Sequence, residues 1–406
     1  MSTIKYWVWL SALRLRPRAK QLMLDHFAQD PMELYYATDK ALQAIEGLRP
    51  EDLERMGRRE LDTALEILGT CEQEGISIVT YQDAAYPKRL KNIYDPPVVL
   101  YGKGRMPAID EELAVAIVGT REATPYGLKM ARHMGYEITR CGGLVVSGLT
   151  RGIDRMGAEG ALRAGGRVIG VLGTGLDQAR GGLYDDVATV GALVTEYPPG
   201  LPPQKQNFRL RNRITAGLSE GVVVVEAPAK SGALLFADEA LEQGKEIFAV
   251  PGNADAPNSV GTNGLIRDGA KAVTSGWEVM EEFLGLYPEK VRDPGAKALE
   301  IPQETEEPLP KSCQNFVKVR EPSAKKVIDK QKPMEYIDLM KEQETLSENQ
   351  RAILTALAVC PLQIDELIEQ TGLDAQTALA ELTMLQLEGL VEQEPGKRFT
   401  LKITRG

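Results

Sequence analysis

The sequence predicts an α/β protein built on a doubly wound parallel sheet, with a small helical domain before it and a winged-helix domain after it. Three observations lead to this prediction. Short apolar runs alternate with amphipathic helical segments through the middle of the chain. Several of these runs end in glycine beside serine or threonine, which is typical of strand-to-helix turns. A stretch rich in Lys, Glu and Pro then separates this region from a last periodic segment.

The first 85 residues show helical periodicity. "KYWVWLSALRLRPRAKQLMLDHF" carries apolar residues at helical spacing, and "RPEDLERMGRRELDTALEILGTCEQEGI" opens with proline and acids and ends near Gly75. We expect residues 1–85 to form an all-α domain of the SAM or helix-hairpin type. The segment that follows, "YPKRLKNIYDPPVVLYGKG", is rich in proline and predicts an irregular connector.

The central domain, residues 86–286, contains apolar runs that are typical of strands buried on both faces. Helical segments connect the runs, so the strands should lie parallel. The main predicted strands are "LAVAIVG" at 113–119, "GLVVSG" at 143–148, "RVIGVLG" at 167–173, "GVVVVEA" at 221–227 and "EIFAVPG" at 246–252. In such a sheet, ligands bind beyond the carboxyl ends of the strands.

The last 120 residues predict a linker and a second domain. Residues 287–345 hold few large apolar side chains and indicate a disordered linker. Residues 346–406 show three helical segments and a hairpin with its turn at Pro395-Gly396, which together predict a winged helix. This segment has a net charge of -4, and its expected recognition helix, 374–388, contains no Lys or Arg. We therefore expect it to contact protein rather than duplex DNA.

Composition excludes several classes of function. The chain has 406 residues, a net charge of -10, two histidines and four scattered cysteines. A zinc site and a Ser-His-Asp triad are therefore poorly supported, and the cysteines are expected to be buried thiols. The sequence shows no signal peptide and no apolar run long enough to cross a membrane, so we expect a cytoplasmic protein.

Four predicted strand-to-helix turns carry the chemistry of anion binding. They are "VGTRE" at 118, "SGLTRGID" at 147, "LGTGLD" at 172 and "EAPAKSGAL" at 226. Backbone N–H groups at such turns bind anions, and Arg121, Arg151 and Lys230 add positive charge in the same layer. A dinucleotide fingerprint and a P-loop are both missing from the sequence.

The segment "KQNFRLRNR" combines cations with an aromatic ring. Lys205 precedes Phe208 by three residues, an arrangement in which a cation meets phosphate while a ring stacks on an unpaired base. The alternative is that Phe208 is a core residue and that the arginines pair with Glu196, Asp238 or Glu239. In an extended chain Arg209, Arg211 and Arg213 share one face, but a helix is expected to begin near Asn212. We expect Arg209 to be the most exposed, with Arg211 and Arg213 divided between phosphate contact and bracing.

The sequence resembles the DNA-processing protein A (DprA/Smf) family. The matching motifs are "YPKRLKNIYDPPVVLYGKG", "IVGTR", "GGLVVSGLTRGID", "GALRAGGRVIGVLGTGLD", "TEYPPG", "NFRLRNRITAGLS", "VVVVEAPAKSGAL", "FAVPGN" and "GTNGLIRDGA". The resemblance covers residues 86–285 densely and the flanking domains loosely. The chain departs from the family pattern at Ala158 and Asp238, where the family has histidine and arginine.

The resemblance implies an extended Rossmann-like domain that binds single-stranded DNA. It also implies a homodimer that loads the recombinase RecA in natural transformation and recombination, without enzymatic activity or a nucleotide cofactor. The family's binding residues correspond here to Arg121, Ser147, Gly148, Arg151, Lys205, Phe208, Arg211, Asn212 and Arg213.

Two alternatives remain at the level of sequence. The sheet type also serves nucleotide-processing hydrolases of the lysine-decarboxylase-like phosphoribohydrolase kind, in which Glu226 could act as a general base. A duplex-reading regulator acting through the winged helix is the other alternative, which the acidic recognition helix disfavours.

Overall fold

The computed structural model describes residues 3–293 except 57–58 and 202, residue 295, and parts of 347–401. The chain forms two compact units, Met1–Arg320 and Glu321–Gly406. The predicted linker lies largely outside the described residues. In the part of the chain that the structure describes, no helix is long and apolar enough to cross a membrane.

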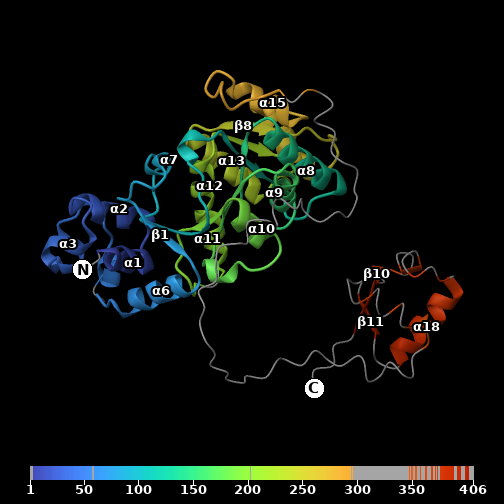
Figure 1. The fold of residues 1–406 in the computed structure, drawn as a ribbon, viewed down its shortest axis with the longest axis horizontal. Coiled ribbons are helices and arrows are strands. Elements are labelled where there is room, and N and C mark those ends of the chain that lie inside the picture. Colours follow the sequence, from blue (N-terminus) through green and yellow to red (C-terminus); the bar gives the residue numbers. More distant parts are fainter. Residues whose placement is uncertain are drawn as a thin grey trace, which may run out of the picture. The chain divides into compact units, whose positions relative to one another are not determined.

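The first unit is built on a nine-stranded sheet in the order β1-β2-β6-β5-β4-β3-β7-β8-β9 (Figure 1). The seven strands from β6 to β9 pair in parallel, whereas β2 pairs antiparallel with both β1 and β6. The parallel strands are β3 Ala114–Val118, β4 Leu144–Ser147, β5 Val168–Val171, β6 Ala192–Thr195, β7 Gly221–Val224, β8 Glu246–Ala249 and β9 Lys271–Ala272. The order β5-β4-β3-β7-β8-β9 reverses direction between β3 and β7, which is the doubly wound arrangement that the sequence predicted.

Helices cover both faces of the sheet, and alternate residues of the central strands show which helix covers which face. Val115 and Ile117 of β3 pack into a core with α8 and α9, whereas Ala116 and Val118 pack into a core with α12 and α13. The helices of this region are α8 Pro125–Arg140, α9 Ile153–Arg163, α10 Leu183–Val190, α11 Lys205–Leu210, α12 Asn212–Leu218, α13 Gly232–Glu242, α14 Val260–Arg267 and α15 Gly276–Met280. Period-2 alternation in a strand buried on both faces therefore divides one apolar run between two cores.

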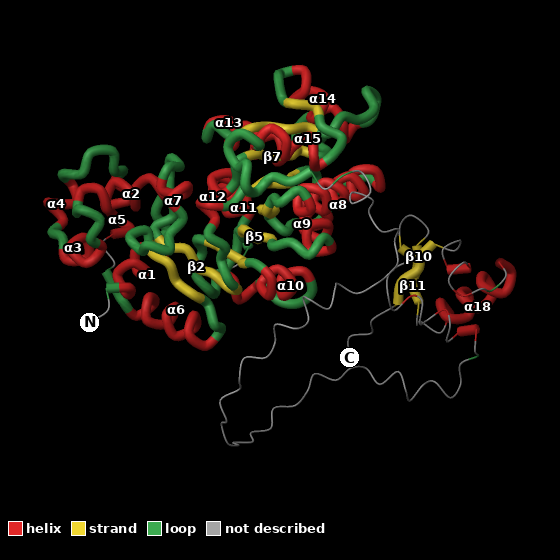
Figure 2. Tube along the Cα trace, turned by 45° about the horizontal axis from the view of Figure 1, so that its top comes forward, coloured by secondary structure: helices red, strands yellow, loops and turns green. Residues whose placement is uncertain are grey.

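The N-terminal helices stand beside the β1–β2 edge of the sheet (Figures 1 and 2). They are α1 Ile4–Ala12, α2 Pro17–His26, α3 Pro31–Tyr36, α4 Asp39–Gln43, α5 Pro50–Met56 and α6 Asp62–Gln73. Ser11 of α1 shares a 2.7 Å hydrogen bond with the hydroxyl of Tyr101 in β2. The helices are therefore fastened to the sheet by a buried polar contact as well as by apolar packing.

Two sequence predictions are wrong at this edge. The expected all-α segment contains β1, Ser77–Thr80, and the expected irregular connector contains β2, Val99–Gly104, after the short helix α7, Lys88–Lys91. The two strands pair antiparallel, with Ser77 opposite Gly102. β1 has only four residues, which is too short for a clear alternating pattern. The run "VVLY", whose β-branched and aromatic residues favour a strand, directly follows two prolines, which indicate an irregular segment. β2 also pairs with β6, which no local pattern shows, so β1 joins the sheet through β2.

The linker was predicted to begin at residue 287, but residues 287–293 pack against the sheet domain. The hydroxyl of Tyr287 donates to Glu220 at 3.0 Å, and Val291 is buried. The backbone N–H of Arg292 donates to the carbonyl of Cys141 at 2.9 Å. Cys141 and Cys71 are buried thiols, as expected, and burial raises the pKa of the Cys71 thiol to about 11. Cys313 and Cys360 lie outside the described residues.

The described part of the second unit agrees with a winged helix. It contains α18, Ala375–Leu387, and a three-stranded antiparallel sheet in the order β10-β12-β11. The strands are β10 Leu362–Gln363, β11 Val391–Glu394 and β12 Arg398–Leu401. Leu382 and Leu385 of α18 pack into a core with Val391 and Phe399 of the hairpin strands. The predicted recognition helix and hairpin are both present.

Candidate nucleic-acid interface

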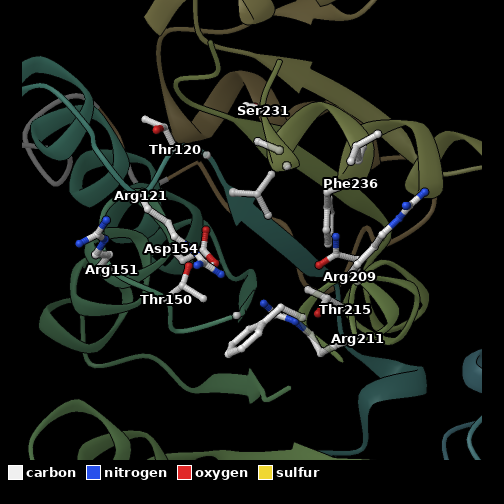
Figure 3. Close-up of a pocket in the computed structure, with 18 of the residues that line it drawn as sticks. Thr120, Arg121, Thr150, Arg151, Asp154, Arg209, Arg211, Thr215, Ser231 and Phe236 are labelled. Atoms are coloured by element: carbon white, nitrogen blue, oxygen red, sulfur yellow. The ribbon is translucent and has the colours of Figure 1, made fainter. Parts of the chain in front are cut away.

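A cavity of about 460 Å³ opens at the carboxyl ends of β3, β4 and β7, where the strand order reverses. Figure 3 shows side chains entering it from two sides, with Arg121, Arg151 and Asp154 on one side and Arg209 and Phe236 on the other. The residues that line the cavity come from the turns after the three strands and from α11, α12 and α13. Five of them are cations, Arg121, Arg151, Arg209, Arg211 and Lys230, and two are acids, Glu122 and Asp154. The cavity is therefore basic in a chain that is acidic as a whole.

The turn after β3 is held by a buried carboxylate. The Glu226 carboxylate accepts hydrogen bonds from the Thr124 backbone N–H at 2.9 Å and from the Thr124 hydroxyl at 2.5 Å. The Glu226 carbonyl accepts from the Thr120 N–H at 2.8 Å. Thr124 in turn caps α8 by accepting from Gly127. Glu226 is buried and absent from the lining of the cavity, so it positions the turn and is unsuited to act as a general base.

The turn after β4 places Asp154 beneath the cavity. The Ser147 hydroxyl donates to the Asp154 carbonyl at 2.9 Å and accepts from the Leu149 N–H at 3.1 Å. The Thr150 hydroxyl donates to the Asp154 carboxylate at 2.9 Å. Burial raises the pKa of Asp154, although the nearby Arg211 guanidinium acts in the opposite direction. Ser147 is fully buried and does not line the cavity, so its role in the structure is to shape the turn.

Arg211 forms the floor of the cavity, and the glycine at position 148 makes room for it. Its Nη1 donates to the Val171 carbonyl at 2.8 Å, and its guanidinium lies where a side chain at Gly148 would stand. Arg211 is only 5% exposed, and burial lowers its pKa. Among the described residues, its Nε and the hydroxyl of Thr215 are buried polar atoms without a hydrogen-bond partner. Such atoms are rare in folded proteins and indicate a missing ligand or water.

Phe208 lies at the mouth of the cavity under a cation. The Arg121 guanidinium stands 5.3 Å from the centroid of the Phe208 ring, within the range of a cation–π contact. The ring is half-buried and lines the cavity, so the alternative of a core residue is wrong. Arg151 is exposed and pairs with Glu122 at 3.1 Å. Ion pairs of this exposed kind contribute little to stability, so Arg151 can exchange Glu122 for a phosphate.

Arg213 points away from the cavity and braces the fold. Its Nη1 and Nη2 each donate to the Glu196 carboxylate at 2.7 Å, and its Nε donates to the Asp95 carbonyl at 2.8 Å. It is 6% exposed and does not line the cavity. The pairing with Glu196 that sequence analysis kept as an alternative holds for this arginine. Arg209 is exposed at the cavity, as expected.

The structure thus brings six of the nine predicted residues to one cavity: Arg121, Gly148, Arg151, Phe208, Arg211 and Asn212. Ser147, Lys205 and Arg213 do not line it. Lys205 is exposed at the first turn of α11, beside the cavity wall. The extended conformation expected before Asn212 is wrong, because residues 205–210 are helical.

The lining residues that sequence reasoning did not single out include Thr150, Thr215 and Phe236. Thr150 lies inside a turn that was noted for its glycine and arginine. Thr215 lies one helical turn after Arg211, so helical periodicity from the arginine onward was the available signal. Among the described residues, no group of three His, Cys, Asp or Glu side chains could hold a metal ion.

Comparisons with known proteins agree with this architecture. The family model of DNA recombination-mediator protein A matches residues 77–284, and that of the DprA winged helix domain matches residues 340–397. The first match begins at the first residue of β1, so the sheet with its antiparallel edge corresponds to the family's domain.

The chain is 32% identical to Protein Smf of Synechocystis sp. (strain ATCC 27184 / PCC 6803 / Kazusa) over 411 residues, which cover 97% of this chain and 98% of that protein. It is 43% identical to DNA processing protein DprA of Bacillus subtilis (strain 168) over 221 residues, which cover 53% of this chain and 74% of the relative. The X-ray structure of DprA from Streptococcus pneumoniae superposes with a TM-score of 0.60 at 32% identity, covering 70% of this chain and 99% of that chain. The chain therefore belongs to the DNA recombination-mediator protein A (DprA/Smf) family, whose members are DNA-binding recombination mediators and not enzymes.

Proposed function

We propose that the cavity at the carboxyl rim binds single-stranded DNA. One observation carries this proposal: the Nε of Arg211 and the hydroxyl of Thr215 are buried without partners in a basic cavity that the Phe208 ring also lines. Cations that contact phosphates and aromatic rings that stack on bases are the two parts of a single-strand site. Membership of a DNA-processing family supports the same ligand.

The geometry favours an unpaired strand over a duplex. The Phe208 ring is reached through a cavity of about 460 Å³, and the bases of a duplex are stacked and paired inside the helix. A nucleotide can place its base on the ring only after leaving that stack, which costs free energy in a duplex and much less in a single strand. Arg121 already covers the ring, so a base displaces the guanidinium or stacks on its outer side.

The test is fluorescence anisotropy with a labelled oligonucleotide, single-stranded or annealed to its complement, across a salt series. We expect the single strand to bind much more tightly than the blunt duplex at each salt concentration. Equal affinities at matched salt contradict the proposal. Salt dependence must accompany the comparison, because phosphate contacts alone make every affinity depend on ionic strength.

The wider role rests on the family. We propose that the protein acts as a homodimer that protects incoming single strands and delivers RecA to them in transformation and recombination, and a cytoplasmic location stays a prediction. Light scattering after size exclusion tests the dimer. The rate at which RecA assembles on single-stranded DNA, with and without this protein, tests the delivery; an unchanged rate contradicts it. The hydrolase alternative is not retained, because the family is not one of enzymes and Glu226 is committed to Thr124.

A further inference from the structure

Tyr94 is an exposed aromatic residue on a rigid loop outside the cavity. It is 74% exposed, although its neighbours are held firmly: Ile93 is buried, and the Tyr86 hydroxyl donates to the Pro97 carbonyl at 2.7 Å. The Asp95 carbonyl accepts from Arg213 at 2.8 Å. The ring therefore stands on a fixed backbone and contributes little to the core, which leaves its apolar face open to a ligand.

One face of the Tyr94 ring already carries a cation. The Arg18 guanidinium lies 5.1 Å from the ring centroid, so the guanidinium and the ring form a cation–π pair at the surface. The high exposure of Tyr94 leaves other parts of the ring open to solvent. A guanidinium beside an open aromatic face is the same combination that the cavity presents with Arg121 and Phe208.

Further cations stand on the helix that precedes this loop. Lys88 is exposed in the first turn of α7, and Lys91, in its last turn, lies 5.0 Å from the Tyr81 ring. Two carboxyl groups lie nearby: Asp95, whose pKa burial raises against the opposing effect of Arg213 and Arg18, and Asp110, which accepts from the backbone N–H groups of Lys88 and Arg89. The loop thus offers basic and aromatic groups beside two acids, one of which, Asp110, is engaged by the start of α7.

The loop lies next to the helices that form the cavity wall. Both views of the fold place α7 between α2, which carries Arg18, and α12 (Figures 1 and 2). Arg213, which holds the loop, follows Arg209, which lines the cavity, by four residues of nearly continuous helix. That separation corresponds to about 6 Å of helix rise. The residue that holds the loop and a residue that lines the cavity therefore belong to the same short helical segment.

We propose that Tyr94 and Arg18 form a second contact for single-stranded nucleic acid, in which a base stacks on the open face of Tyr94 and Arg18 contacts a phosphate. The contact takes a nucleotide outside the cavity, on the side of α11 and α12. It rests on the proposed function, because the strand that it receives is the one held in the cavity. The N-terminal helices then contribute directly to binding through α2.

The experiment compares oligothymidylates of increasing length by anisotropy. For the wild-type protein, affinity should rise when the oligonucleotide becomes long enough to reach Tyr94 from the cavity. Tyr94→Ala should remove that rise, lowering affinity for long oligonucleotides by about 5- to 100-fold, while leaving short ones unchanged. Arg18→Gln should flatten the salt dependence for long oligonucleotides by about 0.7 in log K per log[salt], whereas Tyr94→Ala should not.

Two variants serve as controls. Tyr94→Phe keeps the ring and should bind like the wild type at every length. Tyr36→Ala removes another tyrosine of similar exposure, 68%, from α3 and should also bind like the wild type. Wild-type affinity of Tyr94→Ala at every length overturns the second contact but leaves the cavity proposal standing. Failure of the wild-type protein to bind any single strand overturns both.

Discussion

Two regions of the first unit use the same kinds of residue in opposite ways. In the cavity, Arg211 and Thr215 keep buried polar atoms without partners, and Arg209 is exposed. In what we call the seam, the polar cluster of Arg16, Lys20, Asp52, Asp95, Glu196 and Arg213, each cation donates to a carboxylate or a carbonyl, although the Nε of Arg16 lacks a partner. Arg16, for example, donates to the buried carboxylate of Asp52 at 2.5 Å.

The difference shows how to separate a binding cation from a structural one. Burial alone does not distinguish Arg211 from Arg213, because both are nearly inaccessible. What distinguishes them is the satisfaction of their donors: Arg213 engages a carboxylate in bidentate fashion, whereas Arg211 retains an unpartnered Nε toward the cavity. Because Arg211 lines the basic cavity, its open donor is available to an anion there, whereas the complete pairing of Arg213, outside the cavity, stabilises the fold.

The largest expected effect comes from breaking the seam. Arg213→Ala leaves the Glu196 carboxylate without its bidentate partner and should lower the free energy of unfolding by about 3–5 kcal/mol. Urea unfolding followed by tryptophan fluorescence measures this, because all three tryptophans, Trp7, Trp9 and Trp277, lie in the first unit. Arg209→Ala is the matched control and should change stability by less than about 0.5 kcal/mol. Similar losses in the two variants would remove the distinction between the two regions.

The next effect concerns the mouth of the cavity. Phe208→Ala should weaken single-strand binding by about 1–3 kcal/mol with an almost unchanged salt dependence, because stacking releases no counterions. Anisotropy at several salt concentrations gives both quantities from one titration set. Phe208→Trp keeps a stacking face and should retain binding. If Phe208→Ala unfolds the protein, the Phe208 ring stabilises the fold and its proposed role in stacking is contradicted.

A smaller effect is expected beside the cavity. Lys205 is exposed and does not line the cavity, so it should act as a plain phosphate contact at its edge. Lys205→Ala should flatten the slope of log K against log[salt] by about 0.7, the single-strand value for one phosphate contact. Lys129→Ala removes an exposed lysine of α8 outside the lining residues and is the control. An unchanged slope in Lys205→Ala would exclude this lysine from the interface.

The last expected effect is a pH dependence in the seam. Burial lowers the pKa of Lys20 to about 8, and the attraction of Glu196 opposes this only in part. At pH 7 the folded and unfolded chains both hold the proton, and the folded chain bears the cost of the buried charge. Between about pH 8 and the ordinary value of 10.5 the unfolded chain binds more protons, so the stability contribution of Lys20 rises with pH.

Lys20→Met tests this directly. The stability of the variant minus that of the wild type should be most favourable near pH 7 and should fall as pH rises toward 10. The stability difference between variant and wild type need not reach zero at high pH, because the lysine Nζ also donates to the Ser11 carbonyl at 2.6 Å, a hydrogen bond that methionine cannot form. Urea unfolding at a series of pH values measures the difference, and a difference independent of pH would contradict it.

The sequence was sufficient for the doubly wound sheet because its central strands are continuous apolar runs that end in glycine turns. It was insufficient for β1 and β2, because β2 is stabilised by non-local pairing with β6, and β1 by pairing with β2, rather than by their own patterns. For the cavity, residue types identified Arg121, Phe208 and Arg211. They could not identify Arg213 as a brace, because its partners Glu196 and Asp95 come from separate segments of the chain. The alternating arginines are equivalent in sequence, but in a helix residues two positions apart point to different sides.

The contact between Gly148 and Arg211 makes the chemistry of the cavity a joint property of two distant positions. Any side chain at position 148 would occupy the volume in which the Arg211 guanidinium lies. Gly148→Ala would therefore displace the Arg211 side chain although residue 211 itself is unchanged. In evolutionary terms, the two positions are expected to change together: a lineage that loses the glycine gains nothing by keeping the arginine. The residue that a relative has at position 148 then indicates whether its cavity holds the arginine, although glycine itself offers no side chain to the ligand.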